Sequence, residues 1–141
     1  MFSKILLAVD LNQSKGKRRA AEAAVQLVRA NGAELHILNV LPDNGMAMVS
    51  AALGADHSAK IHAEAEAALA AWAAETLPSD IQATPHVATG TIYDQIIQAA
   101  ETFGCDAIVV GAHRPELKDY LVGPNAARVV RHATQSVFVI R

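Results

Sequence analysis

Hydrophobic positions along the chain follow two patterns that alternate from one end to the other. Short apolar runs rich in β-branched residues are typical of strands buried in a parallel sheet, and they cover residues 5–9, 35–41, 82–87, 107–110 and 136–140. Between them, apolar residues recur at helical spacing and predict helices over about 14–31, 58–77, 91–103 and 124–132. Strand and helix in regular alternation predict a doubly wound α/β domain, in which right-handed crossovers place helices on both faces of a parallel sheet.

Proline and glycine mark where the predicted elements end. The residues that follow an element in this way are Gly32, Pro42, Pro78 and Gly104. Pro85 falls inside the third apolar run and predicts a weaker, interrupted strand there. Thr91, with Asp94 three residues later, resembles a helix N-cap followed by an acidic first turn. Residues 42–57 are loop-like but carry an apolar patch, which either folds over the core or forms a lid or partner surface.

Composition narrows the class of protein. The 141 residues suit one domain spanning 1–141, and 52% hydrophobic with 18% charged residues argues against disorder. A net charge of −2 gives no indication of a nucleic-acid or polybasic membrane binder. Apolar runs are too short to cross a bilayer, and the N-terminal run is too short for a signal peptide. Cys105 is the single cysteine, so we expect neither an internal disulfide nor a cysteine zinc site, and a cytoplasmic location.

Ligands of open parallel sheets bind beyond the carboxyl ends of the strands, where strand order reverses. This rule selects residues 9–12, 40–42 and 111–115, which follow the first, second and fourth strands. The last of these leads to Gly123 and to a helix start, whose free N–H groups and positive dipole end suit a phosphate. Glycine after a strand is also ordinary turn chemistry, and the chain has neither a Walker loop nor a Gly-x-Gly-x-x-Gly motif after its first strand.

Longer motifs carry a family resemblance. The run from Tyr120 to Ala133 reads Tyr-Leu-Val-Gly-Pro-Asn-Ala-Ala-Arg-Val-Val-Arg-His-Ala, and an Arg-Pro pair follows Gly-Ala-His at 111–113. With the first strand and the last strand (136–141), these motifs resemble the short bacterial branch of the universal stress protein family from end to end. The resemblance implies a five-stranded parallel sheet of order 3-2-1-4-5 with four helices, in three α/β/α layers. It also implies that the whole chain is one nucleotide-binding domain.

The resemblance to this family implies that the chain binds an adenine nucleotide together with Mg²⁺. ATP is the first expectation for the nucleotide, and ADP and AMP are the alternatives. Asp10 would contact the ribose or adenine, and Val40 would pack beside the adenine. Gly111 and Gly123 would line the phosphates, together with the backbone near Asn125 and Ala126. The full candidate set is Val9, Asp10, Val40, Gly111, His113, Arg114, Gly123, Pro124, Asn125 and Ala126. We assign no catalytic residue and no protein metal ligand.

The chain departs from the family's ATP-binding pattern at three points. Arg114 stands where that pattern has its second glycine, and eight residues, one fewer than usual, separate it from Gly123. Pro124 replaces a serine or threonine, which removes a hydroxyl and an N–H that could reach a phosphate. Two hypotheses follow for Arg114. Either it supplies a bidentate phosphate contact in compensation, or it lies in solvent and the pocket prefers a nucleotide with fewer phosphates.

Other polar residues have simpler interpretations. His36 and His86 lie in predicted strands and are expected to be structural. The basic residues at the start of the first helix indicate either a solvated face or phosphate steering; these are Lys15, Lys17, Arg18 and Arg19. His113 could face phosphate or simply lie on the surface of its loop. Cys105 has no activating charges in its sequence neighbourhood, so a redox role is not expected.

Three functions remain open at this point. The first is a stress-response regulator that binds a nucleotide. The second is a protein-interaction module with a degenerate pocket, which Pro124 favours. The third is a weak ATPase or self-phosphorylating protein, whose only available base would be Asp10 or His113. The last strand would form a bare sheet edge, and the resemblance implies a homodimer paired along Val137 to Ile140.

Overall fold

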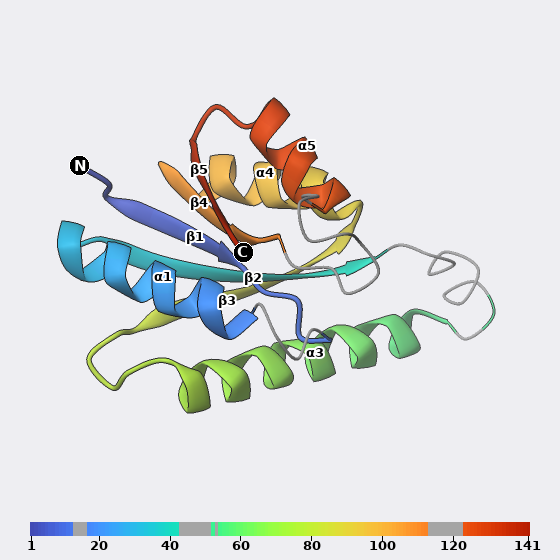
Figure 1. Ribbon diagram of the computed structural model, residues 1–141. Helices are drawn as coiled ribbons and strands as arrows, with labels where there is room; N and C mark the ends of the chain where they lie inside the picture. The colour runs from blue at the N-terminus through green and yellow to red at the C-terminus, as the bar shows by residue number, and fades with distance from the viewer. Residues whose placement is uncertain (13–16, 43–51, 53, 113–122) are drawn as a thin grey trace.

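The computed structural model describes residues 1–12, 17–42, 52, 54–112 and 123–141 (Figure 1). Nine elements follow one another in these residues. The strands are β1 (Lys4–Ala8), β2 (Glu34–Pro42), β3 (Ala83–Gly90), β4 (Ala107–Gly111) and β5 (Ser136–Ile140). The helices are α1 (Lys17–Asn31), α3 (Ala55–Thr76), α4 (Ile92–Phe103) and α5 (Pro124–His132).

All five strands belong to one parallel sheet of order β3-β2-β1-β4-β5. The sheet confirms the doubly wound fold and the strand order expected from the resemblance. β1 lies at its centre, where Ile5, Leu6 and Leu7 are fully buried. A strand covered on both faces has no solvent side, which is why its sequence is continuously apolar rather than alternating.

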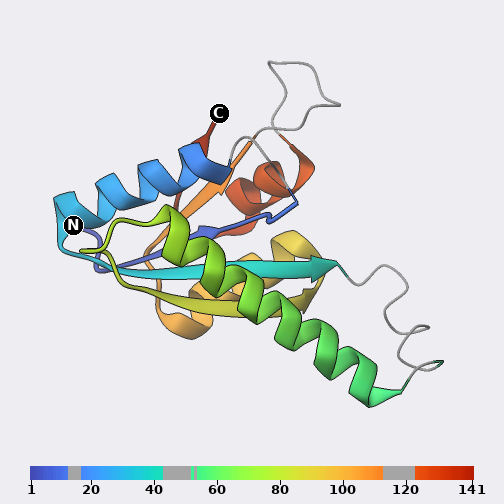
Figure 2. The same cartoon turned by 90° about the horizontal axis from the view of Figure 1, so that it is seen from below.

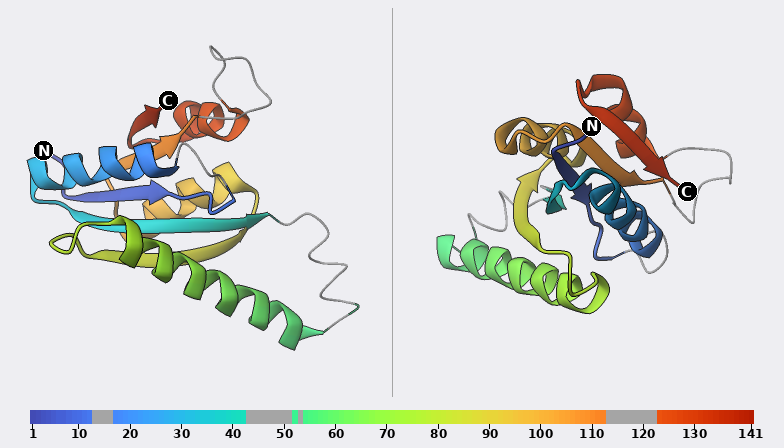
Figure 3. Two further views of the ribbon diagram at one scale, coloured as in Figure 1. Left: turned by 60° about the horizontal axis from the view of Figure 1, so that its bottom comes forward. Right: turned by 90° about the vertical axis from the view of Figure 1, so that its left-hand side faces the viewer.

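Helices cover both faces of the sheet and form three layers. α1 and α3 cover the face toward which Ile5 and Leu7 point, whereas α4 and α5 cover the face of Leu6. Figure 2 looks onto the first of these faces, and the right-hand view of Figure 3 separates the two helix pairs across the sheet. Each face therefore has its own hydrophobic core, and the helices position the carboxyl ends of the strands between them.

α3 is held less firmly than the other helices. It packs mainly along the edge strand β3, and its N-terminal end diverges from the sheet (Figure 2). Among its described side chains only Leu69 is fully buried, while Trp72 and Ala73 are half-buried against the same core. The alanines that fill the rest of the helix favour helix formation without needing burial.

Two local predictions need correction. The third strand is not interrupted at Pro85 but runs through it, because this edge strand pairs only with β2, where Pro85 lies opposite Ile37. Thr91 occupies the N-cap position of α4 and Asp94 lies in its first turn, as predicted, although the Thr91 side chain makes no capping hydrogen bond. α3 begins at Ala55, about one turn before the expected start at 58. The expected start of the first helix, at about residue 14, lies outside the described residues. The apolar patch expected within residues 42–57, which consists of Met46, Met48, Val49 and Leu53, lies outside the described residues.

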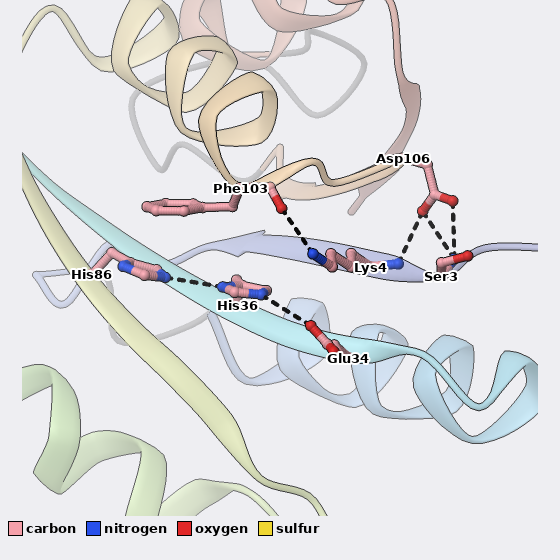
Figure 4. Close-up of polar contacts among 7 residues, drawn as sticks. All are labelled: Ser3, Lys4, Glu34, His36, His86, Phe103 and Asp106. Atoms are coloured by element: carbon pink, nitrogen blue, oxygen red, sulfur yellow. Dashed lines mark hydrogen bonds and ion pairs between the residues drawn. The ribbon is translucent and has the colours of Figure 1, made fainter.

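The amino-terminal ends of the strands are tied together by one carboxylate. The N–H groups of Ser3 and Lys4 donate to Asp106, at 2.9 Å and 3.2 Å, across the start of β1 and β4 (Figure 4). The bond from Ser3, more than any other contact, holds the pKa of this carboxyl below its usual range. The opposite, carboxyl end of the sheet is left free to form a site.

Candidate functional site

A cavity of about 710 Å³ opens at the carboxyl edge of the sheet. Its walls come from the ends of β1, β2 and β4, the start of α1, α4 and α5, and the N-terminal half of α3. The volume lies within the range of about 300–1,000 Å³ found for small-molecule sites. The position is the one that strand-order reversal selects, since β1 is followed in sequence by β2 on one side and lies beside β4 on the other.

Seven of the ten residues predicted from the sequence line this cavity. They are Val9, Asp10, Val40, Gly111, Gly123, Asn125 and Ala126. Pro124 is exposed and is not part of the wall, while His113 and Arg114 lie outside the described residues. Residues from four separate segments of the chain thus line one cavity. They meet there because parallel strands bring their carboxyl ends to the same edge of the sheet.

The β1 side of the cavity is anchored through its backbone. The N–H of Val9 donates to the carbonyl of Leu38 at 2.8 Å, which continues the ladder one residue beyond β1. The next residue, Asp10, is exposed, and its Oδ1 accepts the N–H of Asn12 at 3.0 Å. A carboxylate has several lone pairs, so Asp10 retains acceptor capacity for a hydroxyl or N–H of a ligand.

The α5 side presents the start of a helix. Gly123 is buried at the N-cap position, and its carbonyl accepts the N–H of Ala127 at 3.0 Å. Pro124 occupies the first helical turn, where its fixed φ suits the helix but its nitrogen carries no hydrogen. The N–H groups of Asn125 and Ala126 belong to the first turn and have no partner within the helix, and both residues line the cavity.

The structure adds wall residues that the sequence interpretation missed. Lys17, taken as one of a basic cluster, lines the cavity, and its Nζ donates to the carbonyl of Leu11 at 3.3 Å. Asn39 lines it from β2 and was not selected, although a polar residue within the apolar run 35–41 was a usable signal. The apolar wall from α3 and α4 had no sequence signal, because any amphipathic helix would show the same pattern; it consists of Ile61, Ala65, Ala68, Ile92 and Ile96.

A second cavity of about 730 Å³ lies between α3, β3 and α4, and none of the eight predicted site residues that the structure describes lines it. His86 on its wall shares a hydrogen bond with His36, Nε2 to Nδ1 at 2.9 Å, and Phe103 stacks on His86 at 3.8 Å between ring centroids (Figure 4). Burial, with the neighbouring His36 second, lowers the pKa of His86. The pair joins β2 to β3, in agreement with the structural role expected for it.

Three further properties of the described residues concern the cysteine, metal binding and membrane spanning. Burial raises the pKa of the Cys105 thiol to about 11, so it remains protonated at neutral pH. Within the described ranges, no three His, Cys, Asp or Glu side chains converge as a metal-binding group. None of the helices described is both long enough and apolar enough to cross a membrane.

Known proteins resemble this chain over its full length. The family model for the universal stress protein family matches residues 1–141. Universal stress protein G of Shigella flexneri is 30% identical over 145 residues, which cover 100% of both chains.

Solved structures share the fold. A hypothetical protein whose biochemical function was assigned from its structure superposes with a TM-score of 0.82 at 22% identity, covering 99% of this chain and 96% of that one. A universal stress protein from Archaeoglobus fulgidus in complex with dAMP superposes with a TM-score of 0.71 at 21% identity, covering 99% and 98%. At such identities these structures establish the fold, whereas the match of sequence and family model establishes kinship. The chain belongs to the universal stress protein family.

Proposed function

We propose that this chain binds an adenine nucleotide, ATP before ADP or AMP, in the cavity at the carboxyl edge of its sheet, and acts as a stress-response regulator. One observation carries the proposal: seven residues selected from the sequence for nucleotide contact line one cavity of suitable volume. The relative that holds dAMP supports an adenine nucleotide as the ligand class. A cytoplasmic location belongs to the same proposal, since a lone cysteine suits a reducing compartment.

The proposed nucleotide lies with its base beside Val40 and its ribose toward Asp10. Its phosphates lie near Gly111 and Gly123, at the start of α5, where the helix end and its N–H groups favour an anion. Lys17 supplies a cationic side chain on the same wall. Where Mg²⁺ accompanies ATP, phosphate oxygens and waters supply most of its ligands, as is usual for this ion.

Two measurements test nucleotide binding. Mass spectrometry of ligand released from freshly purified protein should detect an adenine nucleotide, and calorimetry should show saturable binding of ATP. Asp10→Ala should weaken ATP binding by about tenfold, because one hydrogen bond to the ligand is lost. Asp80→Ala is the matched control: it also removes one exposed carboxylate, which pairs with Arg29 at 2.8 Å on the distant surface. Equal affinity of the two variants would remove Asp10 from the site.

A substitution at Arg114 distinguishes the two hypotheses for how the cavity would hold phosphates: that Arg114 contacts them, or that it lies in solvent and the pocket prefers fewer phosphates. If Arg114 holds the terminal phosphates, Arg114→Ala should weaken ATP binding by about tenfold or more and leave AMP binding nearly unchanged. Unchanged ATP affinity would eliminate compensation by this residue. A wild-type preference for AMP over ATP would then favour a pocket shaped for fewer phosphates.

A protein-interaction module is the second candidate, favoured by Pro124 and by the position of β5. Among the described strands β5 pairs with β4 alone, so its outer edge carries backbone groups available to another strand. We propose a homodimer through this edge, Val137 to Ile140. Analytical ultracentrifugation should show a dimer, and Val139→Lys should shift it toward monomer, because a charge on an edge strand opposes pairing. A stable wild-type monomer would refute the dimer.

Slow ATP hydrolysis or self-phosphorylation is the weakest of the three candidates. Asp10 is the one described acid at the β1 end of the cavity that could act as base, and it is exposed rather than enclosed. Labelled-ATP turnover by purified protein tests this function. Turnover that survives unchanged in Asp10→Ala would exclude Asp10 as the base.

A further inference from the structure

The second cavity, of about 730 Å³, follows the outer edge of β3, which among the described strands pairs with β2 alone. Four successive residues of this strand, 85–88, line it, although neighbouring side chains of a strand point to opposite faces of the sheet. A space that touches both faces must pass around the edge of the strand. Because α3 covers one face there and α4 the other, the cavity is a groove bounded by two helices and a strand edge.

Pro85 determines which backbone groups of β3 face the groove. Successive residues of a parallel strand turn their N–H and carbonyl alternately toward one neighbour and the other. Pro85 has no N–H to give to β2, where it lies opposite Ile37, so residues 84 and 86 make the ladder and residues 85 and 87 face outward. The carbonyls of Pro85 and Val87 therefore meet the groove, with the N–H of Val87 between them.

An edge with more acceptors than donors is a poor template for another strand, because strand pairing needs both in alternation, and proline at an edge is a known protection against it. A ligand rich in hydrogen-bond donors fits this edge better than a peptide does.

His86 adds a further acceptor to the groove. Its Nε2 shares a hydrogen bond with Nδ1 of His36, so one of the two nitrogens donates. Oε2 of Glu34 lies 3.6 Å from the other nitrogen of His36, Nε2, and favours a hydrogen there (Figure 4). Nδ1 of His36 is then the acceptor and Nε2 of His86 the donor. This leaves Nδ1 of His86 with a lone pair that no described hydrogen bond uses.

Side chains from the two helices have the same polarity. Glu66 on α3 is charged, and neither Lys nor Arg is among the described residues that line the groove. Oε1 of Glu66 accepts from Nε2 of His62 at 2.7 Å, which leaves its second oxygen for another donor. The amide nitrogen of Gln98 on α4 donates to Asp94 at 2.9 Å, so the Gln98 carbonyl oxygen remains an acceptor.

The remaining wall of the groove is apolar. Phe103 stacks on His86 at 3.8 Å between ring centroids, and Leu38 and Val87 lie at the strands. We propose that this groove binds an aliphatic primary amine as its ammonium ion. The N–H donors of the ammonium match the acceptors of Glu66, His86 and the β3 edge, and the chain lies along the apolar wall. The inference is independent of nucleotide binding, which is proposed for the other cavity.

The n-hexylammonium ion is the probe, and 1-hexanol and hexanoate are its controls, because they have the same chain length but a neutral or a negative head. In an NMR titration of the isotope-labelled full chain at neutral pH without nucleotide, hexylammonium should shift amides of residues 85–88 and of α3 near Glu66. Amides of Asp10 and Gly111, in the other cavity, should not move. Hexanol should bind about tenfold more weakly, and hexanoate more weakly still.

Glu66→Gln removes the negative charge and keeps the shape of the side chain. It should weaken hexylammonium binding about three- to tenfold, since the carboxylate is 59% exposed and partly screened, and should leave hexanol binding unchanged. Glu75→Gln is the matched control, because Glu75 is an exposed glutamate of the same helix and lines neither cavity.

A second pair of variants tests the place of binding. Ala67→Trp fills the groove from α3 and should abolish hexylammonium binding. Ala74→Trp makes the same change at another exposed alanine of α3, outside both cavities, and should leave binding intact. Both alanines are exposed, so the thermal midpoints of the two variants should stay close to that of the wild type.

Several results would overturn the amine site. One is that none of the three probes binds; another is equal affinity for all three, which would describe an apolar groove without preference for a cation. Shifts centred on Asp10 and Gly111 would place the amine in the other cavity. Equal losses in Glu66→Gln and Glu75→Gln would remove Glu66 from the site. Each of these results leaves nucleotide binding standing, because that is measured with ATP in separate titrations.

Discussion

Leu69 is the most deeply buried side chain of α3 among those that the structure describes. α3 has 22 residues, yet among those described only Leu69 is fully buried, within the core shared with α1. Leu69→Ala removes that contact and leaves a cavity in a wall that cannot fully collapse. The expected loss of unfolding free energy is about 3–5 kcal/mol, as for other leucines at fully buried sites. Domains of this kind have about 5–15 kcal/mol in total, so the effect is large.

The loss converts into a measurable shift of the thermal midpoint. With about 2.1 cal/mol/K of unfolding entropy per residue over the 141 residues, 3–5 kcal/mol corresponds to roughly 10–17 °C. The damage should also be local, because α3 packs mainly on the edge strand β3 and can separate before the rest unfolds. Since α3 supplies Ile61, Ala65 and Ala68 to the carboxyl-edge cavity, nucleotide affinity should fall too.

Urea unfolding and hydrogen exchange with mass spectrometry measure the two effects. In Leu69→Ala, amides of α3 should exchange faster than in the wild type by a larger factor than amides of α4. Leu27→Ala is the matched control, because this leucine on α1 is half-buried against the same core and should cost less. The reasoning is refuted if the two variants lose equal stability, or if exchange accelerates uniformly along the chain.

Three further predictions follow from single groups. Cys105 should resist a thiol reagent in the native protein and react after denaturation, because burial raises its pKa to about 11; rapid native labelling would contradict this. Gly104 ends α4 at φ 69°, so Gly104→Ala should cost about 1 kcal/mol in urea unfolding, and no loss would show that the turn rearranges. His86 has a lowered pKa in the native state, so the unfolded chain binds protons first as pH falls. Stability should therefore decrease from about pH 7 to pH 5, and His86→Phe should flatten that slope. The charged groups around the pair are Glu34, which approaches His36 at 3.6 Å, Lys4, which binds the carbonyl of Phe103, and Glu66 across the second cavity.

The order of elements and the place of the site followed from the sequence. A buried parallel strand must be apolar on both faces, so continuous apolar runs such as 107–110 could be recognised as strands. Glycine or proline showed where helices end. Once the strands are parallel, their carboxyl ends share one edge, and residues as far apart as Asp10 and Gly123 were expected to meet there. Family resemblance added the strand order, which the sheet confirms, and the class of ligand that we propose.

Tertiary structure decided what depends on neighbours rather than on local pattern. No feature of residues 35–41 says that Asn39 is buried, because this depends on what the register with β3 and the covering helices place beside it. The pairing of His36 with His86, residues 50 apart in the chain, likewise needed the register of two strands. The strand at 82–87 was predicted, but its continuity through Pro85 was not, because proline is compatible with a strand only at a sheet edge, and edges are defined by topology. Spacing along the chain determines which face a side chain takes; burial and hydrogen bonding are determined by what folds against that face.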